Sequence, residues 1–250
     1  MDLMLEGRVA VVTGAASGMG AATARSLAAE GAVVVPADID EAGVATTAAA
    51  MEAEPIILDV RDAAACDAAV AEVSRHHGRL DVLINAAGII IRSEAWQTST
   101  EEWERIFAVN VNGVFFMSRA AIPAMRAGGG GAIVNFGSIW GSVGAPGTAA
   151  YTATKGAVHQ LTRSMALEHA NEHIRINAVC PGEIDTPMLA SERNHPVTRE
   201  FLDALAAGAV PTGRLGHPEE VARVATFLAS DAASYMTGAL VNVDAGFTAR

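Results

Sequence analysis

Short apolar runs alternate along this chain with longer helical patterns. Residues 9–12 read Val-Ala-Val-Val, residues 33–35 are three valines, and an alanine-rich stretch lies between them. A short continuous apolar run is typical of a buried strand, whereas apolar residues three and four apart are typical of a helix. The alternation predicts an α/β fold. We expect strands at residues 9–13, 33–35, 55–60, 80–84, 133–136, 174–179 and 239–243, and helices at 20–30, 63–77, 100–125, 151–167, 197–207 and 218–228.

The length and composition favour one domain. With 250 residues, 51% of them hydrophobic, the chain can bury a large core as one domain or as two small ones. Because no linker or repeat interrupts the pattern, we expect a single domain over residues 1–250. Residues 189–212 form an insertion-like segment between a strand and the next helix, and long loops of this kind often close over a substrate. We therefore predict a substrate lid at 189–212.

Charge and hydropathy exclude several kinds of partner. No apolar run approaches the length needed to span a membrane, and the first residues lack a basic segment followed by an apolar one. We expect a cytoplasmic protein without membrane contact. The formal net charge of −11 disfavours nucleic acid and anionic lipid as partners, since both need clustered cations.

The cysteines and histidines give no sign of a redox or metal site. Cys66 and Cys180 lie far apart in apolar surroundings, so buried free thiols are expected rather than a disulfide. His169 and His173 are four residues apart, but the metalloprotease pattern requires Glu directly after the first His. We expect both to be solvated and predict no metal site.

A glycine turn follows the first predicted strand. Gly14, Gly18 and Gly20 lead into a helical pattern, and such a turn lets a pyrophosphate approach the backbone at the helix N-terminus. The alternative is an ordinary βα turn. Asp38 ends the second strand eighteen residues after Gly20, where a carboxylate can bind ribose hydroxyls and repel a 2′-phosphate. This favours NAD over NADP, unless Asp38 instead caps the next helix, which Asp40 could do.

Candidate acid/base chemistry lies between residues 138 and 155. Tyr151 and Lys155 are four residues apart, so on a helix the ammonium could act on the phenol. The free phenol has a pKa of about 10, and proton transfer near neutral pH needs a positive charge that favours the tyrosinate. Ser138 follows the apolar run 133–136 and would emerge at the carboxyl end of a strand, where open α/β sheets bind ligands. A packed tyrosine and a solvated lysine are the competing interpretation.

Two further segments leave alternatives open. Asn110 lies in the predicted helix 100–125, where a buried amide is either satisfied structurally or part of a site. This helix lacks a full capping box when Thr100 is paired with Trp103. The apolar residues 89–91 follow a predicted strand and form either a substrate wall or plain core.

Several motifs together resemble the classical short-chain dehydrogenase/reductase family over essentially the whole chain. The motifs are Thr13-Gly14-x-x-x-Gly18-x-Gly20, Asn85-Ala-Ala-Gly88, Asn110, Ser138, Tyr151-x-x-x-Lys155 and Pro181-Gly182, with thirteen residues from Ser138 to Tyr151. Two positions depart from the family pattern: Ala86 replaces a frequent Asn, and Ala245 replaces a frequent Gly.

The resemblance implies a Rossmann-like doubly wound parallel sheet of about seven strands with helices on both faces. Tyr151 would be the general acid/base, Lys155 would lower its pKa and hold the nicotinamide ribose, and Ser138 would hydrogen-bond the substrate oxygen. Asn110 would anchor a water relay to Lys155. The expected cofactor-binding residues are Gly14, Ser17, Met19, Gly20, Asp38, Ile39, Asp59, Val60, Asn85, Ala86, Gly88, Tyr151, Lys155, Pro181, Gly182, Ile184 and Thr186.

The expected function is NAD-dependent interconversion of a secondary alcohol and a ketone. Apolar substrate surface is expected from Ile90, Trp96, Trp140 and Met188, and polar selectivity from Glu183 and His195. A cyclic, aromatic or otherwise apolar substrate is favoured. Similarity to the family also suggests a homotetramer, packed through the helices that begin near Thr100 and Tyr151 and through the C-terminal segment.

Three other functions fit the sequence less well. A 3-oxoacyl thioester reductase usually prefers NADPH and needs cations to dock an acidic carrier, so Asp38 and the negative charge count against it. A non-catalytic nucleotide-binding scaffold would be expected to have lost a catalytic residue. A serine hydrolase would need glycines where Phe136 and Trp140 flank Ser138.

Overall fold

Seven parallel strands form one sheet at the centre of the computed structural model, which describes residues 3–192 and 196–249. The strand order is β3-β2-β1-β4-β5-β6-β7, so the order reverses between β1 and β4 as in a doubly wound sheet. The predicted fold class is confirmed. The strands are β1 (Val9–Thr13), β2 (Val33–Asp38), β3 (Ile56–Ile57), β4 (Val82–Asn85), β5 (Gly131–Phe136), β6 (Ile174–Pro181) and β7 (Leu240–Val243).

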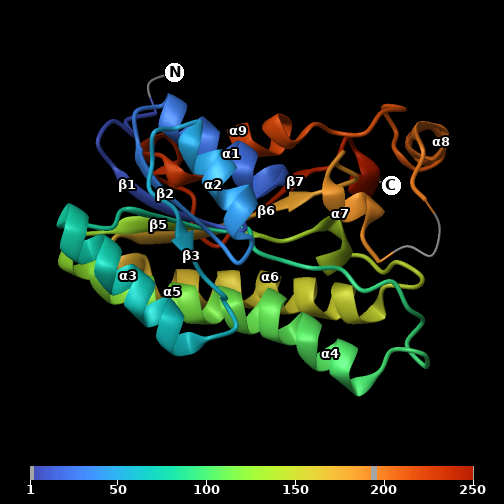
Figure 1. Cartoon of the computed structure of the whole chain (residues 1–250), viewed down its shortest axis with the longest axis horizontal. Helices are drawn as coiled ribbons and strands as arrows, with labels where there is room; N and C mark the ends of the chain where they lie inside the picture. The colour runs from blue at the N-terminus through green and yellow to red at the C-terminus, as the bar shows by residue number, and fades with distance from the viewer. Residues whose placement is uncertain (1–2, 193–195, 250) are drawn as a thin grey trace.

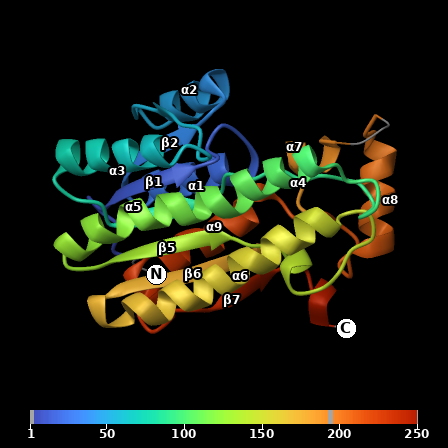
Figure 2. The same ribbon diagram turned by 90° about the horizontal axis from the view of Figure 1, so that it is seen from below.

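Helices cover both faces of the sheet (Figure 1). α1, α2 and α9 lie on one side, and α3, α5 and α6 lie side by side across the other (Figure 2). α7 and α8 gather at one end of the molecule. The helices are α1 (Gly18–Ala29), α2 (Glu41–Ala49), α3 (Ala63–His77), α4 (Thr100–Phe107), α5 (Gly113–Ala127), α6 (Ala149–His169), α7 (Pro187–Ala190), α8 (Arg199–Ala209) and α9 (Pro218–Ala229).

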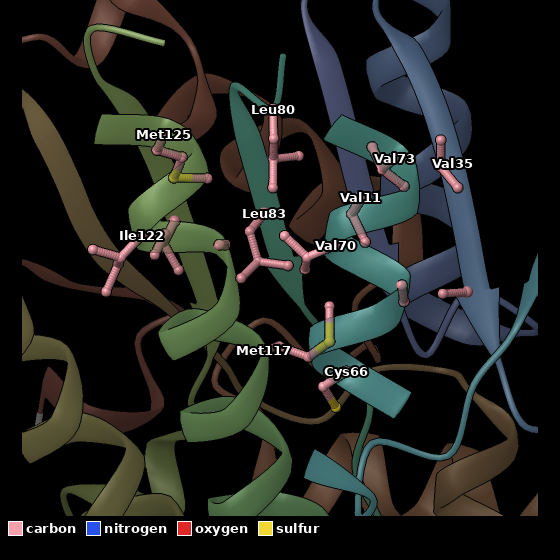
Figure 3. Packing of buried hydrophobic residues seen from close by; sticks show 14 of the residues in the cluster. Val11, Val35, Cys66, Val70, Val73, Leu80, Leu83, Met117, Ile122 and Met125 are labelled. Carbon is pink, nitrogen blue, oxygen red and sulfur yellow. The ribbon is translucent and has the colours of Figure 1, made fainter. Parts of the chain in front are cut away.

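Alternate residues of each central strand feed two cores. Val9 and Val11 of β1 pack towards α3 and α5, whereas Ala10 and Val12 pack towards α1 and α9. Figure 3 shows the first core, where side chains of α3 and α5 meet Leu83 of β4. Because both faces are buried, the strands read as continuous apolar runs.

Most predicted elements are present with bounds shifted by a few residues, and two differ more substantially. The expected strand 55–60 is paired in register with β2 at Ile56 and Ile57, and the Leu58 N–H donates to the Asp38 carbonyl oxygen at 2.9 Å. Leu58 and Val60 are buried. The expected helix 100–125 is divided by a π-helical turn at Ala108–Asn112, which separates α4 from α5. Such turns insert one extra residue and are frequent at functional sites.

Together these helical pieces form one stretch, Thr100–Ala127, that is long and apolar enough to cross a membrane by length and composition alone. The expectation that no run approaches this length was therefore wrong. The stretch packs on the sheet, where Met117, Ala121 and Met125 are fully buried. A core helix of a globular protein passes the same test of length and hydropathy.

The side chains expected to be inert are mostly placed as predicted. Cys66 and Cys180 are buried free thiols. His173 is exposed, but His169 is half-buried, and its Nδ1 lies 2.9 Å from the Glu172 carboxylate. The prediction of a solvated His169 was therefore wrong.

The α4 helix begins with a complete capping box, one residue earlier than expected. The Glu102 N–H donates to Ser99 Oγ at 3.1 Å, and the Ser99 N–H donates to the Glu102 carboxylate at 2.9 Å. The prediction that the box is incomplete paired the wrong residues.

We expect Ser99→Ala to lower the free energy of unfolding by about 1 kcal/mol, because it leaves a helix amide without its acceptor. Urea unfolding would measure the loss. Thr100→Ala, which removes a hydroxyl outside the box, serves as the control. Equal losses in the two variants would contradict the role of the cap.

Candidate active site

The glycine turn after β1 packs closely on itself and on the loop after β4. Gly14 and Gly18 have positive φ values of 69° and 55°, which favour glycine. A Cβ on Gly14 would lie 2.6 Å from the backbone of Ala86, and one on Gly20 would overlap the Gly14 carbonyl oxygen. The turn borders a cavity of about 420 Å³ at the carboxyl ends of β1, β2 and β4. Larger residues at 14 or 20 would collide with the backbone and change the path of the turn that borders the cavity.

Asp38 holds the loop beside the turn. One carboxylate oxygen accepts from the Ala16 N–H at 3.0 Å, and the other accepts from the Asp40 N–H at 3.0 Å. Asp40, not Asp38, caps α2 by accepting from the Gly43 N–H at 3.1 Å. The capping alternative for Asp38 is therefore excluded, and its carboxylate lines the cavity.

Two arginines that no local motif indicates, Arg61 and Arg105, also line this cavity. Arg61 reaches it from the loop after β3, and its guanidinium lies 2.6 Å from the Asp59 carboxylate. The hydrogen bond with Arg61 lowers the pKa of Asp59, so the carboxylate stays ionised. Its negative charge offsets the positive charge of the guanidinium.

Most residues expected at the cofactor surround this cavity or the one next to it. Asn85 does not: its amide is buried beneath the sheet edge, where it donates to Ser118 Oγ at 3.1 Å and to Asn135 Oδ1 at 2.9 Å. The structure thus gives the Asn85 side chain a place in the core. The cavity-lining members of the expected set are Gly14, Ser17, Met19, Gly20, Asp38, Ile39, Asp59, Val60, Ala86, Gly88 and Thr186 in the first cavity, and Tyr151, Lys155, Pro181, Gly182 and Ile184 in the second.

The second cavity, of about 350 Å³, contains the candidate acid/base groups. Ser138 lies just beyond β5, and Tyr151 and Lys155 lie one turn apart on α6. The two cavities share wall residues and are therefore adjacent: Met19, Ala86, Gly88, Thr186 and Met188. A molecule extended along the first cavity would end beside Tyr151.

The phenol of Tyr151 is buried, with 7% of the residue exposed. Burial raises its pKa to about 12, and a hydrogen bond with the Ser138 side chain acts in the opposite direction. The charge of Glu183 raises the pKa of Tyr151 slightly, and the charge of Arg92 lowers it slightly. The phenol is thus neutral in the protein alone and is suited to donate a proton.

The ammonium of Lys155 also lies inside the site. Its Nζ donates to the Phe136 carbonyl oxygen at 2.7 Å and lies 5.6 Å from the centre of the Tyr151 ring. Burial lowers the pKa of Lys155 to about 8, so the group remains largely protonated at pH 7. The net shift of the Tyr151 pKa is upward, because burial outweighs the interactions that lower it. The lowering expected from Lys155 stays a prediction.

Asn110 connects the loop after β4 to α6. Its Oδ1 accepts from the Ile89 N–H at 2.8 Å, and its Nδ2 donates to the Ile89 carbonyl oxygen at 2.9 Å and to Thr154 Oγ1 at 3.1 Å. The amide is fully satisfied by these contacts. It does not line either cavity, and its direct effect is to fix the loop that carries Ile90.

The predicted substrate residues lie together around the second cavity. Ile90, Trp140, Glu183 and Met188 all line it, so the loop 89–91 is both wall and core. Trp96 is 79% exposed and does not line it, so that expectation was wrong. His195 lies outside the described residues.

Other wall residues were missed because they come from distant segments. Arg92 follows the loop after β4, and Phe247 comes from the C-terminal 3₁₀ turn (Phe247–Ala249), where its ring contacts Trp140 at a centroid distance of 5.2 Å. No local motif could have indicated Phe247. Leu189, Leu205 and Ala209 extend the wall from the predicted lid segment.

Two arginines fasten the beginning of that segment. Arg92 Nε donates to the Ser191 carbonyl oxygen at 3.3 Å, and the Arg105 guanidinium lies 3.0 Å from the Glu192 carboxylate. Arg105 also lines the first cavity. The α7 end of the segment is thereby held across both cavities.

We expect the phenol of Tyr151 to resist ionisation. The chain has two tyrosines, and Tyr235 is fully exposed, so Tyr235→Phe leaves Tyr151 as the only phenol. The ordinary pKa of a tyrosine phenol is 10.0, so an unshifted phenol would be half ionised at pH 10. In this variant the phenolate absorbance at pH 10 should stay below half its full value. The unfolded chain ionises first, so stability should fall as the pH rises from about 10 towards about 12. Half-ionisation at or below pH 10 would contradict this environment.

Comparisons with known proteins find relatives that align along nearly the whole chain. Residues 14–248 match the family described as Enoyl-(Acyl carrier protein) reductase. The chain is 44% identical to galactitol 2-dehydrogenase (L-tagatose-forming) of Cereibacter sphaeroides, over 98% of this chain and 96% of that protein. It is 39% identical to the 3-oxoacyl-[acyl-carrier-protein] reductase of Thermotoga maritima, over 98% of this chain and 99% of the relative. The crystal structure of gox2181 superposes with a TM-score of 0.92 at 40% identity, covering 100% of this chain and 98% of that one.

Proposed function

The chain belongs to the short-chain dehydrogenase/reductase family and is an oxidoreductase, and from this premise we propose that it interconverts a secondary alcohol and a ketone with NAD. The observation that carries the proposal is one cavity holding Ser138, Tyr151 and Lys155 beside a second cavity bordered by the glycine turn. The dehydrogenase relative named above acts on a polyol, which carries secondary hydroxyls.

The residues present fit a dinucleotide. The glycines at 14 and 20 allow the tight turn that places the N-terminus of α1 at the cavity, where backbone amides favour a pyrophosphate, and the Ser17 side chain makes no capping bond there. Asp38 would hold the adenosine ribose, and Thr186 and Ile184 would border the nicotinamide. Bound NAD supplies the acceptor for the hydride of the alcohol carbon.

Tyr151 would move the proton. In ketone reduction its neutral phenol donates to the carbonyl oxygen, which becomes the alcohol hydroxyl, and in oxidation the tyrosinate takes that proton back. The Ser138 hydroxyl would orient the same substrate oxygen. The Lys155 ammonium would stabilise the tyrosinate as it forms. Asn110 would support Lys155 through the loop that it fixes. We also propose that Asn110 anchors a water relay to Lys155.

The preference for NAD rests on charge. A 2′-phosphate would meet the carboxylates of Asp38 and Asp40, and the nearby Arg61 is already paired with Asp59. Arg105, which also lines this cavity, is paired with Glu192, so each arginine of the cavity wall already has a carboxylate partner. We infer that NADP binds more weakly than NAD.

A substrate panel tests the proposed reaction. Cyclopentanol, 2,3-butanediol, galactitol and a sugar phosphate would each be offered with NAD and with NADP, and reduced cofactor would be followed by its absorbance. We expect turnover of uncharged secondary alcohols with NAD. Turnover of charged sugars alone would refute the apolar substrate class.

A 3-oxoacyl thioester reductase is the second candidate, because a relative of this activity aligns along the whole chain. The net charge of −11 disfavours docking of an acidic carrier. Reduction of a 3-oxoacyl thioester with NADPH, without alcohol oxidation in the panel, would favour it. A non-catalytic scaffold would be inactive in both assays, although the chain retains Asn110, Ser138, Tyr151 and Lys155.

We also propose a cytoplasmic homotetramer. Exposed apolar residues on the helices expected at the interfaces support this assembly: Trp103 on α4, Phe115 on α5 and Leu167 on α6. Light scattering of the purified protein would give its mass, and a monomer would contradict the assembly.

A further inference from the structure

His159 lies one helical turn beyond Lys155 on the same face of α6. Tyr151, Lys155 and His159 are spaced four residues apart, and all three are buried. His159 is 2% exposed, and the reaction proposed above gives it no proton to carry. Its ring contacts the turn that presents Ser138.

The contacts of the ring surround the backbone of Ser138. His159 Nε2 lies 3.3 Å from Cys180 Sγ on β6, and Nδ1 lies 3.4 Å from Ser142 Oγ. The backbone of Ser138 and of Gly141 lies close enough to the ring to act on the pKa of His159, and the backbone of Ser138 likewise acts on the pKa of the Cys180 thiol. His159 and Cys180 together therefore hold the chain where it leaves β5.

The glycines on either side of Ser138 allow this close approach. A Cβ on Gly137 would lie 2.6 Å from His159 Nε2, and a Cβ on Gly141 would lie 2.5 Å from His159 Cε1. Real side chains do not approach so closely. Glycine at 137 and 141 therefore lets the chain pack directly against the imidazole ring. Lys155 holds the preceding segment by donating to the Phe136 carbonyl oxygen.

The contact is between neutral groups at physiological pH. Burial, followed by the charges of Lys155 and Arg163, lowers the pKa of His159 to about 4. Burial raises the pKa of the Cys180 thiol to about 11. A neutral imidazole keeps one donor and one acceptor nitrogen, so it can hold two partners in fixed directions.

We propose that His159, together with Cys180, is a positioning residue that fixes residues 137–141 so that the Ser138 hydroxyl meets Tyr151 and the substrate oxygen. The inference rests on the role proposed for Ser138. His159 lies behind the acid/base pair on the same face of α6 and contacts the chain that carries Ser138, not the substrate.

A double-mutant cycle with Ser138→Ala tests this proposal. We expect His159→Leu to lower kcat at least about tenfold with the NADH dissociation constant unchanged, and His159→Gln, which keeps a donor and an acceptor, to recover most of the rate. In the Ser138→Ala background, His159→Leu should change kcat by less than about twofold. Met165→Ala, a cavity variant on α6 in the core away from this turn, controls for lost stability. Equal effects of His159→Leu in both backgrounds would overturn the proposal.

Amide hydrogen exchange provides a readout that needs no substrate. The Trp140 N–H donates to Ser138 Oγ at 3.2 Å, and the Gly141 N–H donates to the Ser138 carbonyl oxygen at 3.0 Å. His159→Leu should accelerate exchange at these two amides, whereas Met165→Ala should not. If the substrate panel fails but this exchange changes as expected, the proposed reaction is wrong and the positioning contact stands. If His159→Leu does not fold, Cys180→Ala takes its place, and unchanged exchange in the folded variant would refute the contact.

Discussion

Replacing Tyr151 with Phe is expected to lower kcat for oxidation of a secondary alcohol by about 100- to 10,000-fold, the usual contribution of a positioned acid or base. The phenyl ring can keep the packing of the phenol against Ile90 and Ile106, so the fold should persist. What disappears is the phenol that lies in the cavity with Ser138 and Lys155 and is proposed to exchange a proton with the substrate oxygen. The rate of NADH formation, followed by stopped-flow or steady-state absorbance, would measure the loss.

The matched control is Tyr235→Phe, which removes the same hydroxyl from the other, exposed tyrosine. This variant should retain the parental rate. Binding of NADH, followed by fluorescence, should be similar in both variants. A folded Tyr151→Phe protein that binds NADH and oxidises alcohols at the parental rate would refute the proposed mechanism.

The order of strands and helices could be predicted because the hydrophobic pattern is local. A run such as residues 9–12 needs no partner to be read as a buried strand, and α3 has the predicted bounds, Ala63–His77. The predicted edge strand is longer than β3, because the length of β3 depends on its pairing with β2. An apolar run alone does not show how far such pairing extends. The π-helical turn at Asn110 also depends on distant partners, Ile89 and Thr154.

The candidate site was predictable where a motif fixes its own geometry. The spacing of Tyr151 and Lys155 places both on one helix face, and the structure brings them into one cavity with Ser138. Their pKa values were not predictable, because burial acts on both groups: it raises that of the phenol and lowers that of the ammonium. Phe247 enters from the far end of the chain, which no local pattern encodes.

Two single residues illustrate the same limit. Asn85 belongs to a motif, yet its side chain points to Asn135 and Ser118 in the core. Ala245 stands where glycine is frequent in the family, and the structure shows the reason for that frequency: its φ is 53°, in the left-handed region. Both facts depend on the path of the backbone, which a motif describes only in part.

Asp38→Ala is expected to reduce the preference for NAD over NADP by about 10- to 100-fold, through weaker NAD binding and stronger NADP binding. Each hydrogen bond to a charged group contributes about 1.5 to 3 kcal/mol, and the same carboxylate repels a 2′-phosphate. Without it, Arg61 would remain paired with Asp59, so binding of NADP should improve only modestly. The ratio of kcat/KM for the two cofactors would measure the change. Asp40→Ala removes a carboxylate that lines the same cavity but caps α2, and it should alter stability more than cofactor choice. If both variants keep the parental ratio, the carboxylates do not set cofactor choice, and the NAD preference must come from contacts elsewhere in the cavity.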